Sequence, residues 1–269
     1  MLKDFFQYQF IQNALLASIL TSILCGLIGV IIVEKKMLMM SGGIAHTAYG
    51  GVGLGYLLNF EPILGALVFA ICAAVGVGFI KRKGGVNSDI VISLFWSLGM
   101  ALGILFISLM NGYPPDMNSY LFGNILSVTK YNIYIMFIIT IFVSLFIIMF
   151  FEDWKAYLFD EQFSEIIGMK TRILEYLCLV LIALTVVILI KVTGIILSLA
   201  LLTAPAATAT LLSKKLKSRM ILSVILGNIF CFAGLLISFK ANIPSGATII
   251  IFCVLFYVIT LSTHLVKNK

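Results

Sequence analysis

The chain has 269 residues, of which 62% are hydrophobic and 11% are charged, and its formal net charge is +7. A soluble domain of this length is about half apolar and about a quarter charged, so this composition excludes a soluble protein and indicates a polytopic membrane protein. The sequence contains no GxxxxGK[ST], HExxH or GxSxG motif, so nothing in it predicts nucleotide binding or an enzyme.

Several apolar runs are long enough to cross a membrane, because a transmembrane helix needs about 20 apolar residues. They cover residues 12–33, 38–58, 62–80, 89–110, 131–151, 172–191, 194–212, 218–239 and 246–265. The sequence therefore predicts an all-α bundle of about nine transmembrane helices, in one membrane domain covering residues 1–269. Eight spans and a re-entrant segment would fit the same pattern.

The basic residues predict which side of the membrane each loop occupies. When alternate loops are assigned to opposite sides, fourteen lysines and arginines fall on one side and four on the other. The positive-inside rule makes the first side cytoplasmic, so we expect the N-terminus outside and the C-terminus inside. The positive charges therefore set the orientation of the chain in the lipid bilayer. Because this placement explains them, no nucleic-acid partner is predicted. Anionic lipid or a cytosolic protein can contact the same residues.

The loop from Asn111 to Lys130 is expected on the outer side. Pro114 and Pro115 end the preceding helix. Between Met117 and Val128, apolar residues recur near helical spacing. This spacing predicts a short helix on the outer surface.

The longest cytoplasmic loop predicts an amphipathic helix from Phe159 to Gly168. Its apolar face carries Phe159, Phe163, Ile166 and Ile167. Its polar residues are Asp160, Glu161, Ser164 and Glu165. Gly168 supplies a C-cap. Helices that lie in a membrane interface favour Lys and Arg on their polar face, so this acidic helix favours docking on a protein, with an interfacial position as the alternative.

The second apolar run contains the stretch SGGIAHTAYGGVGLG, residues 41–55, with one histidine and six glycines. His46 is the only histidine well inside a predicted span, and no aspartate, glutamate, lysine or arginine lies in a span interior. Ionisable groups at this depth are costly and face a cavity or the bundle interior. Two interpretations stay open for His46: a ring that only hydrogen-bonds a neighbour, or a ligand for a first-row divalent metal.

The glycines around His46 also have two interpretations. Their partial small-xxx-small spacing predicts close packing of helix backbones, whereas local unwinding would turn backbone carbonyls toward a passage. Both interpretations place the segment in the middle of the bundle. Pro205, in the run LLTAPAATATLL, permits a kink in the seventh predicted span. That run is predicted to pack closely or to line the passage.

Five parts of the sequence, in order, resemble the membrane permeases of bacterial ABC importers for zinc and manganese. They are SGGIAHTAYGGVGLGY, SLGMALGILFISL with SYLFGNILSV, FDEQFSEIIG, LALLTAPAATATLL and IPSGATIII. The resemblance covers about residues 10 to 265. It implies a multi-pass protein of the bacterial plasma membrane that forms a permease dimer with two cytoplasmic ATPase subunits and an external metal-binding protein. The divalent metal ion is then the transported substrate, and no permanently bound cofactor is implied.

Carried over residue by residue, the resemblance matches the family's pathway histidine to His46 and its ATPase-docking helix to residues 159–168. The family often has an aspartate four residues before that histidine, where this chain has Gly42. One strong side-chain ligand therefore remains. Water, backbone carbonyls, Ser41 or Thr47, or a second copy of His46 across a dimer axis would complete the coordination.

The expected translocation path also includes Gly50 and Pro205. A single histidine does not decide whether Zn²⁺ or Mn²⁺ is the substrate. A permease for a metal chelate of the siderophore or cobalamin type is one alternative, and it should have a wide cavity without a lone central imidazole. A membrane scaffold without transport is another, and it would not explain the acidic docking helix.

Overall fold

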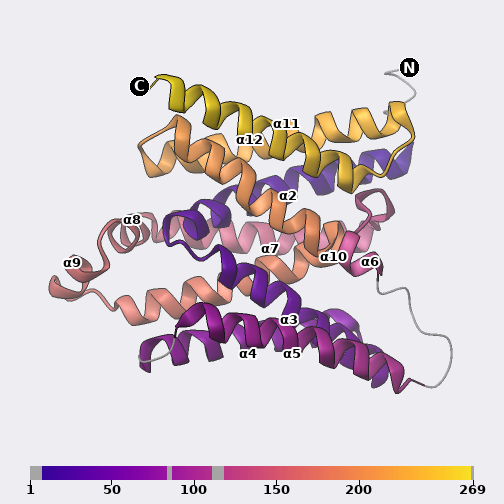
Figure 1. Cartoon of the computed structure of the whole chain (residues 1–269), viewed down its shortest axis with the longest axis horizontal. Coiled ribbons are helices and arrows are strands. Elements are labelled where there is room, and N and C mark those ends of the chain that lie inside the picture. Colours follow the sequence, from indigo (N-terminus) through magenta and orange to yellow (C-terminus); the bar gives the residue numbers. More distant parts are fainter. Residues whose placement is uncertain (1–7, 84–86, 111–117, 268–269) are drawn as a thin grey trace.

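The computed structural model describes residues 8–83, 87–110 and 118–267, and all regular structure within these ranges is helical. Figure 1 shows the long helices running roughly along one direction, with α8 and α9 at one end of the bundle and α6 at the other. The elements are α2 (Gln9–Glu34), α3 (Leu38–Leu57), α4 (Pro62–Lys83), α5 (Ser88–Ser108), α6 (Asn118–Phe122), the 3-10 helix η1 (Ile125–Ser127), α7 (Lys130–Met149), α8 (Phe151–Phe159), α9 (Glu161–Ile166), α10 (Thr171–Leu212), α11 (Leu216–Ala241) and α12 (Ser245–Lys267). The all-α prediction is confirmed.

Within the described ranges, seven helices are long and apolar enough to cross a membrane, namely α2, α4, α5, α7, α10, α11 and α12. Helix α3 has 20 residues, but glycine, serine, threonine and histidine replace large apolar side chains along it, so its hydropathy is lower. The membrane-spanning architecture is therefore confirmed, and the number of helices that composition alone supports is lower than the predicted nine.

Helix α10 is broken at Gly194. Its 42 residues are about twice what one span requires, and Gly194 has non-helical angles of φ 76° and ψ 167°. Glycine tolerates this positive φ because it has no Cβ. The backbone of Gly194 packs on that of Gly123 in the α6–η1 segment, and a Cβ on either residue would lie within 2.4 Å of the other's backbone nitrogen. The break at Gly194 lies at the predicted boundary between the apolar runs 172–191 and 194–212.

Ion pairs tie the helices together at the end that holds α8 and α9. Glu175, buried near the start of α10, pairs with Lys81 (Nζ to Oε1, 3.1 Å) and with Arg82 at the end of α4. Arg219 at the start of α11 pairs with Glu34 at the end of α2.

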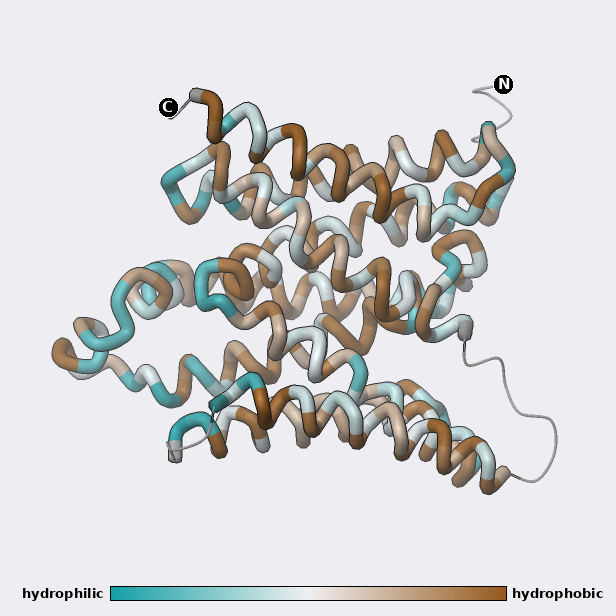
Figure 2. Tube along the Cα trace, in the orientation of Figure 1, coloured by the Kyte–Doolittle hydropathy of each residue, from teal (hydrophilic) through white to brown (hydrophobic). Residues whose placement is uncertain are grey.

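Figure 2 shows hydrophilic segments at the two ends of the bundle and mainly hydrophobic segments between them. This distribution suits a protein whose middle lies in lipid.

Helix α3 is continuous and packs against α4 and α5 at backbone contact. A Cβ on Gly51 would lie 2.0 Å from the Gly65 carbonyl oxygen of α4, and a Cβ on Gly53 would lie 2.6 Å from the Gly103 carbonyl oxygen of α5. Ordinary contact for a Cβ begins at 3.4 Å. Small residues let membrane helices approach in this way. The close-packing interpretation of the glycines is therefore confirmed, and α3 is helical throughout Leu38–Leu57, without the local unwinding of the alternative interpretation.

The predicted outer surface helix from Met117 to Val128 is also different in the structure. Residues 111–117, which include both prolines, lie outside the described residues. The remainder forms α6 and η1, which are separated at Gly123 with a φ of 64°. Ile125 of η1 is 1% exposed, and the Val128 carbonyl accepts a hydrogen bond from Asn13 of α2 at 3.2 Å. The segment therefore packs into the bundle because its apolar residues find partners on α2 and α10.

Candidate functional site

His46 lies near the middle of α3, where α5 passes at backbone contact. A Cβ on Gly99 of α5 would lie 2.4 Å from the Cα of Thr47. The His46 ring stacks on Trp96 of α5, with ring centroids 4.0 Å apart and an angle of 11° between the planes. The Nδ1 atom of His46 lies 3.4 Å from the Sδ atom of Met100, which is one helical turn after Trp96. Two side chains of α5 thus hold a partly buried imidazole.

The two hydroxyl residues expected beside His46 bond to the backbone. Ser41 donates its Oγ proton to the Leu38 carbonyl at 2.8 Å. The hydroxyl of Thr47 lies 2.8 Å from the Gly43 carbonyl of its own helix and 3.0 Å from the Phe95 carbonyl of α5. Both residues are buried. Each hydroxyl donates its proton to a backbone carbonyl, which fixes the position of its oxygen against the backbone of α3 or α5.

The three remaining path candidates occupy different surroundings. A Cβ on Gly42 would meet only Trp96 at 3.4 Å and Leu199 at 4.0 Å, so this position, one turn before His46, has room for a methyl group. A Cβ on Gly50 would lie 2.7 Å from the Gly99 carbonyl oxygen, so Gly50 serves the contact of α3 with α5. Pro205 is buried inside α10. The structure thus groups Gly42 with His46 and uses Gly50 for packing.

The predicted helix from Phe159 to Gly168 is two helices with a break at Asp160. Asp160 has an extended φ of −150°, and its Oδ1 accepts a hydrogen bond from the backbone N–H of Phe163 at 2.9 Å, so it caps α9. A single helix across this segment is therefore wrong. Phe159 ends α8 with 92% of its surface exposed, whereas Phe163, Ile166 and Ile167 belong to α9 and its C-cap, with 56–82% exposed.

The C-cap expected at Gly168 is confirmed. Gly168 has a φ of 84°, its N–H donates to the Glu165 carbonyl at 3.1 Å, and the N–H of Met169 donates to the Ser164 carbonyl at 3.0 Å. This pair of bonds is the Schellman arrangement, which satisfies carbonyls at a helix end. The hydroxyl of Ser164, which is fully buried, donates to the Asp160 carbonyl at 2.7 Å. A helix of six residues is thus closed at both ends while its apolar side chains stay exposed.

Lys35, in the turn between α2 and α3, anchors α8 and α9 to the bundle. Its Nζ lies 2.8 Å from a carboxylate oxygen of Glu161 on α9 and 3.5 Å from the centroid of the Tyr157 ring on α8. Tyr157 is buried beside Trp154. Burial and the nearby Glu161 carboxylate raise the pKa of the Tyr157 hydroxyl, so it stays neutral. The turn that leads into the His46 helix is therefore bonded directly to α9.

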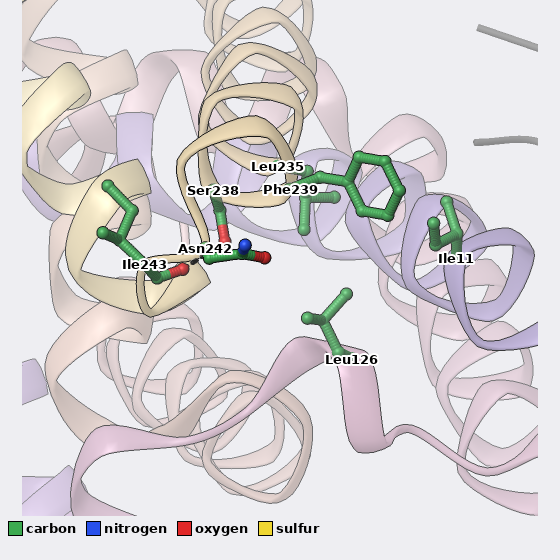
Figure 3. A pocket seen from close by; sticks show the side chains of 7 residues that line it. All are labelled: Ile11, Leu126, Leu235, Ser238, Phe239, Asn242 and Ile243. Carbon is green, nitrogen blue, oxygen red and sulfur yellow. Dashed lines mark hydrogen bonds between the residues drawn. The ribbon is translucent and has the colours of Figure 1, made fainter. Parts of the chain in front are cut away.

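Among the cavities that the described residues form, two lie at opposite ends of the molecule. One, of about 250 Å³, lies beside the α11–α12 turn, where the Ser238 hydroxyl donates to the Ile243 carbonyl at 2.6 Å (Figure 3). Its lining consists of Ile11, Leu126, Leu235, Ser238, Phe239, Asn242 and Ile243. It has no carboxylate, imidazole or thiol, so its side chains offer little to a divalent metal. The other, of about 480 Å³, lies beside Phe159 and is lined by four lysines and an arginine.

Sequence reasoning missed Trp96, Met100 and Glu175. Trp96 and Met100 are four residues apart, so they share a face of α5, and the uncommon tryptophan was the available signal. Nothing in the sequence shows that this face meets His46. Glu175 is the fourth residue of the predicted span 172–191. The available signal was the pair of basic residues at the end of α4, Lys81 and Arg82, which need an acidic partner and find it in Glu175.

A sequence profile of the ABC 3 transport family matches residues 7–264. An uncharacterized membrane protein of Synechocystis sp. is 40% identical over 256 residues, which cover 95% of this chain and 91% of that protein. The manganese transport system membrane protein MntC of Listeria monocytogenes is 33% identical over 258 residues, covering 96% of this chain and 92% of that protein. The structure of PsaBC from Streptococcus pneumoniae in complex with a Fab matches with a TM-score of 0.87 at 32% identity, covering 97% of this chain and 95% of that chain.

Proposed function

The chain belongs to the ABC 3 transport family, and from this premise we propose that it is the permease subunit of an importer that passes a divalent transition-metal ion across the plasma membrane beside His46. The name of the Listeria relative supports Mn²⁺ as a substrate, and Zn²⁺ binds imidazole as well. The permease forms the path, and a separate ATPase subunit hydrolyses ATP.

The observation that carries this proposal is the imidazole at mid-span. His46 is partly buried, is held by Trp96, and lies one turn after Gly42, where a methyl group would find room. A transport path must bind its ion weakly enough to release it. One histidine without a neighbouring carboxylate meets that requirement better than a closed cage of ligands.

The chain crosses the membrane nine times in this proposal. The two halves of α10 cross separately, because the break at Gly194 leaves two segments of about span length. Helix α3 crosses as well, shielded by α4 and α5 despite its lower hydropathy. The end that holds α8 and α9 is cytoplasmic, in agreement with the excess of basic residues in its loops. The N-terminus then lies outside and the C-terminus inside.

Helices α8 and α9 couple the permease to the ATPase. Exposed apolar side chains at Phe159, Phe163 and Ile166 would insert into a groove of that subunit. The ion pair from Glu161 to Lys35 connects α9 to the turn before α3. A displacement of α9 by the ATPase is therefore transmitted to the helix that carries His46.

A second copy of the chain completes the path. Helix α5 exposes Leu94, Leu98 and Leu105 on the side that does not pack on α3, with 50–65% of each exposed. This apolar face, next to the Trp96–His46 pair, suits contact with an equivalent helix, which would bring a second His46 near the first. An external metal-binding protein would deliver the ion at the end that holds α6.

The test is ATP-dependent metal uptake by proteoliposomes that contain the whole complex, with the external binding protein supplied. His46→Ala should lower uptake of Mn²⁺ or Zn²⁺ at least about tenfold, since even an outer partner of a metal ligand is worth about 10–100-fold in affinity. Met136→Leu, a volume-conserving change at a buried residue of α7 away from the site, is the control and should assemble and transport normally. Uptake of a metal chelate without uptake of the free ion would contradict the proposal, as would normal transport by His46→Ala.

A further inference from the structure

The donor atoms around His46 are few. Within the described ranges, no group of three His, Cys, Asp or Glu residues could hold a metal ion. The hydroxyls of Ser41 and Thr47 are engaged with backbone carbonyls, and Gly42 has no side chain. The side chain that approaches the His46 ring nitrogen is the thioether of Met100.

The distance between these two atoms suits joint binding of one ion. Imidazole nitrogen binds Zn²⁺ at about 2.0–2.1 Å, and a thiolate sulfur, the nearest reference for a thioether, binds it at about 2.3 Å. Two such ligands at an angle of about 90–109° lie about 3.1–3.5 Å apart. The Nδ1 of His46 and the Sδ of Met100 are 3.4 Å apart. We propose that Met100 is a second ligand of the transported ion, so that His46 and Met100 form a nitrogen–sulfur site between α3 and α5.

The surroundings keep the two ligand atoms facing each other. The stacked ring of Trp96 fixes the plane of the imidazole, and Trp96 and Met100 stand one turn apart on the same face of α5. When Nδ1 carries the ring proton, it can donate to the thioether sulfur, which can only accept. When the proton moves to Nε2, the lone pair of Nδ1 and those of the sulfur point toward the same space. The resting contact thus holds both ligands in place for an ion.

A thioether changes the preference of the site. Sulfur ligands favour softer ions, whereas carboxylate oxygens suit Mn²⁺, Mg²⁺ and Ca²⁺. A site of His46 and Met100 therefore favours Zn²⁺ and Cd²⁺ over Mn²⁺ and rejects Mg²⁺ and Ca²⁺. This inference deepens the proposed function and rests on it, because it names the class of ion that the same path selects.

The first test is direct observation of the ligands. The full chain in lipid nanodiscs is loaded with one equivalent of Zn²⁺, and X-ray absorption at the zinc edge is recorded for the native protein, for Met100→Leu and for Met136→Leu. Leucine is close to methionine in volume, and Met136 is a buried methionine of α7, which packs on α2 and α10. The spectrum of the native protein and that of Met136→Leu should show a sulfur neighbour near the zinc–thiolate distance of about 2.3 Å. The spectrum of Met100→Leu should lack it. Only nitrogen and oxygen neighbours in the native protein, or a sulfur neighbour that persists in Met100→Leu, would overturn the inference.

The second test is selectivity of uptake by the whole complex. Met100→Leu should lower the preference for Cd²⁺ over Mn²⁺ in competition by about tenfold or more, the scale of losing a partner of a metal ligand, whereas Met136→Leu should keep the native ratio. An unchanged ratio in Met100→Leu would refute the role of the sulfur while leaving metal transport intact. A native complex that takes up no metal would instead refute the proposed function.

Discussion

A methyl group at Gly51 should separate α3 from α4 and destabilise the permease. Its Cβ would lie 2.0 Å from the Gly65 carbonyl oxygen and 2.7 Å from the Ala66 nitrogen. To regain the ordinary contact distance of 3.4 Å, the two backbones must move apart by about 1.4 Å, since 3.4 − 2.0 = 1.4. The clashing atoms belong to the backbone and cannot rotate away. Overpacking costs about 1–3 kcal/mol and sometimes more, and Gly51→Ala should fall at the upper end.

The assay is thermal unfolding of the purified chain in detergent, with Gly42→Ala as the control. The same methyl group at Gly42 meets only Trp96 at 3.4 Å and Leu199 at 4.0 Å, and alanine favours a helix over glycine by about 1 kcal/mol. Since 1 kcal/mol shifts the midpoint by about 2–4 °C in a protein of this size, Gly51→Ala should lower Tm by about 6–12 °C. Gly42→Ala should leave Tm equal or slightly higher. Equal Tm values for the two variants would refute the close contact of α3 with α4.

Two further predictions concern the orientation of the bundle and the role of α9. In a Cys72→Ser background, an impermeant thiol reagent added to intact cells should label Lys130→Cys and spare Lys215→Cys. Both lysines are exposed, and they stand at the starts of α7 and α11, which begin at opposite ends of the bundle (Figure 1). The reverse pattern would invert the proposed orientation. Phe163→Ala should weaken binding of the ATPase by about 2 kcal/mol, as expected for an aromatic hot spot, and lower uptake accordingly, whereas Phe122→Ala, an exposed aromatic at the other end, should bind the ATPase normally. Equal ATPase affinity for both variants would make α9 a connector in the membrane interface.

The bounds of the long helices could be predicted closely because long apolar runs allow few structures in lipid. The run 38–58 became α3 at Leu38–Leu57, and the run 89–110 became α5 at Ser88–Ser108. In hydrocarbon, every backbone group must bond within its own segment, which leaves the helix as the available form for such runs. The boundary between the runs 172–191 and 194–212 likewise coincides with Gly194, whose positive φ interrupts α10.

The short helices were harder to predict because local signals competed. Apolar residues at helical spacing favoured one helix from Phe159 to Gly168, yet Asp160 prefers to cap the N–H of Phe163 and so starts a new helix. The α6–η1 segment was misplaced for a different reason. Its burial depends on the contact of Gly123 with Gly194, which lie far apart in the sequence.

Of the candidate site, the sequence predicted the histidine on α3 but not its partners on α5. His46 stood out because an ionisable ring at bilayer depth is costly. Its partners did not, since the face of α5 that meets α3 is decided by backbone contacts such as Gly99 on Thr47. Met100 has the same apolar character as its neighbours in the sequence. Only the folded arrangement places its sulfur 3.4 Å from the imidazole.

The packing of α3 also bears on how ATP hydrolysis would reach the metal. A helix in backbone contact with α4 and α5 along its glycines cannot bend freely, because interiors at this density transmit displacement. Lys35 joins α9 to the turn at the base of α3. A push on α9 would therefore move α3 as one rigid helix against its neighbours. Because His46 belongs to α3 and Met100 to α5, a small slide between these two helices would change the distance between the ligand atoms and so the affinity for the ion.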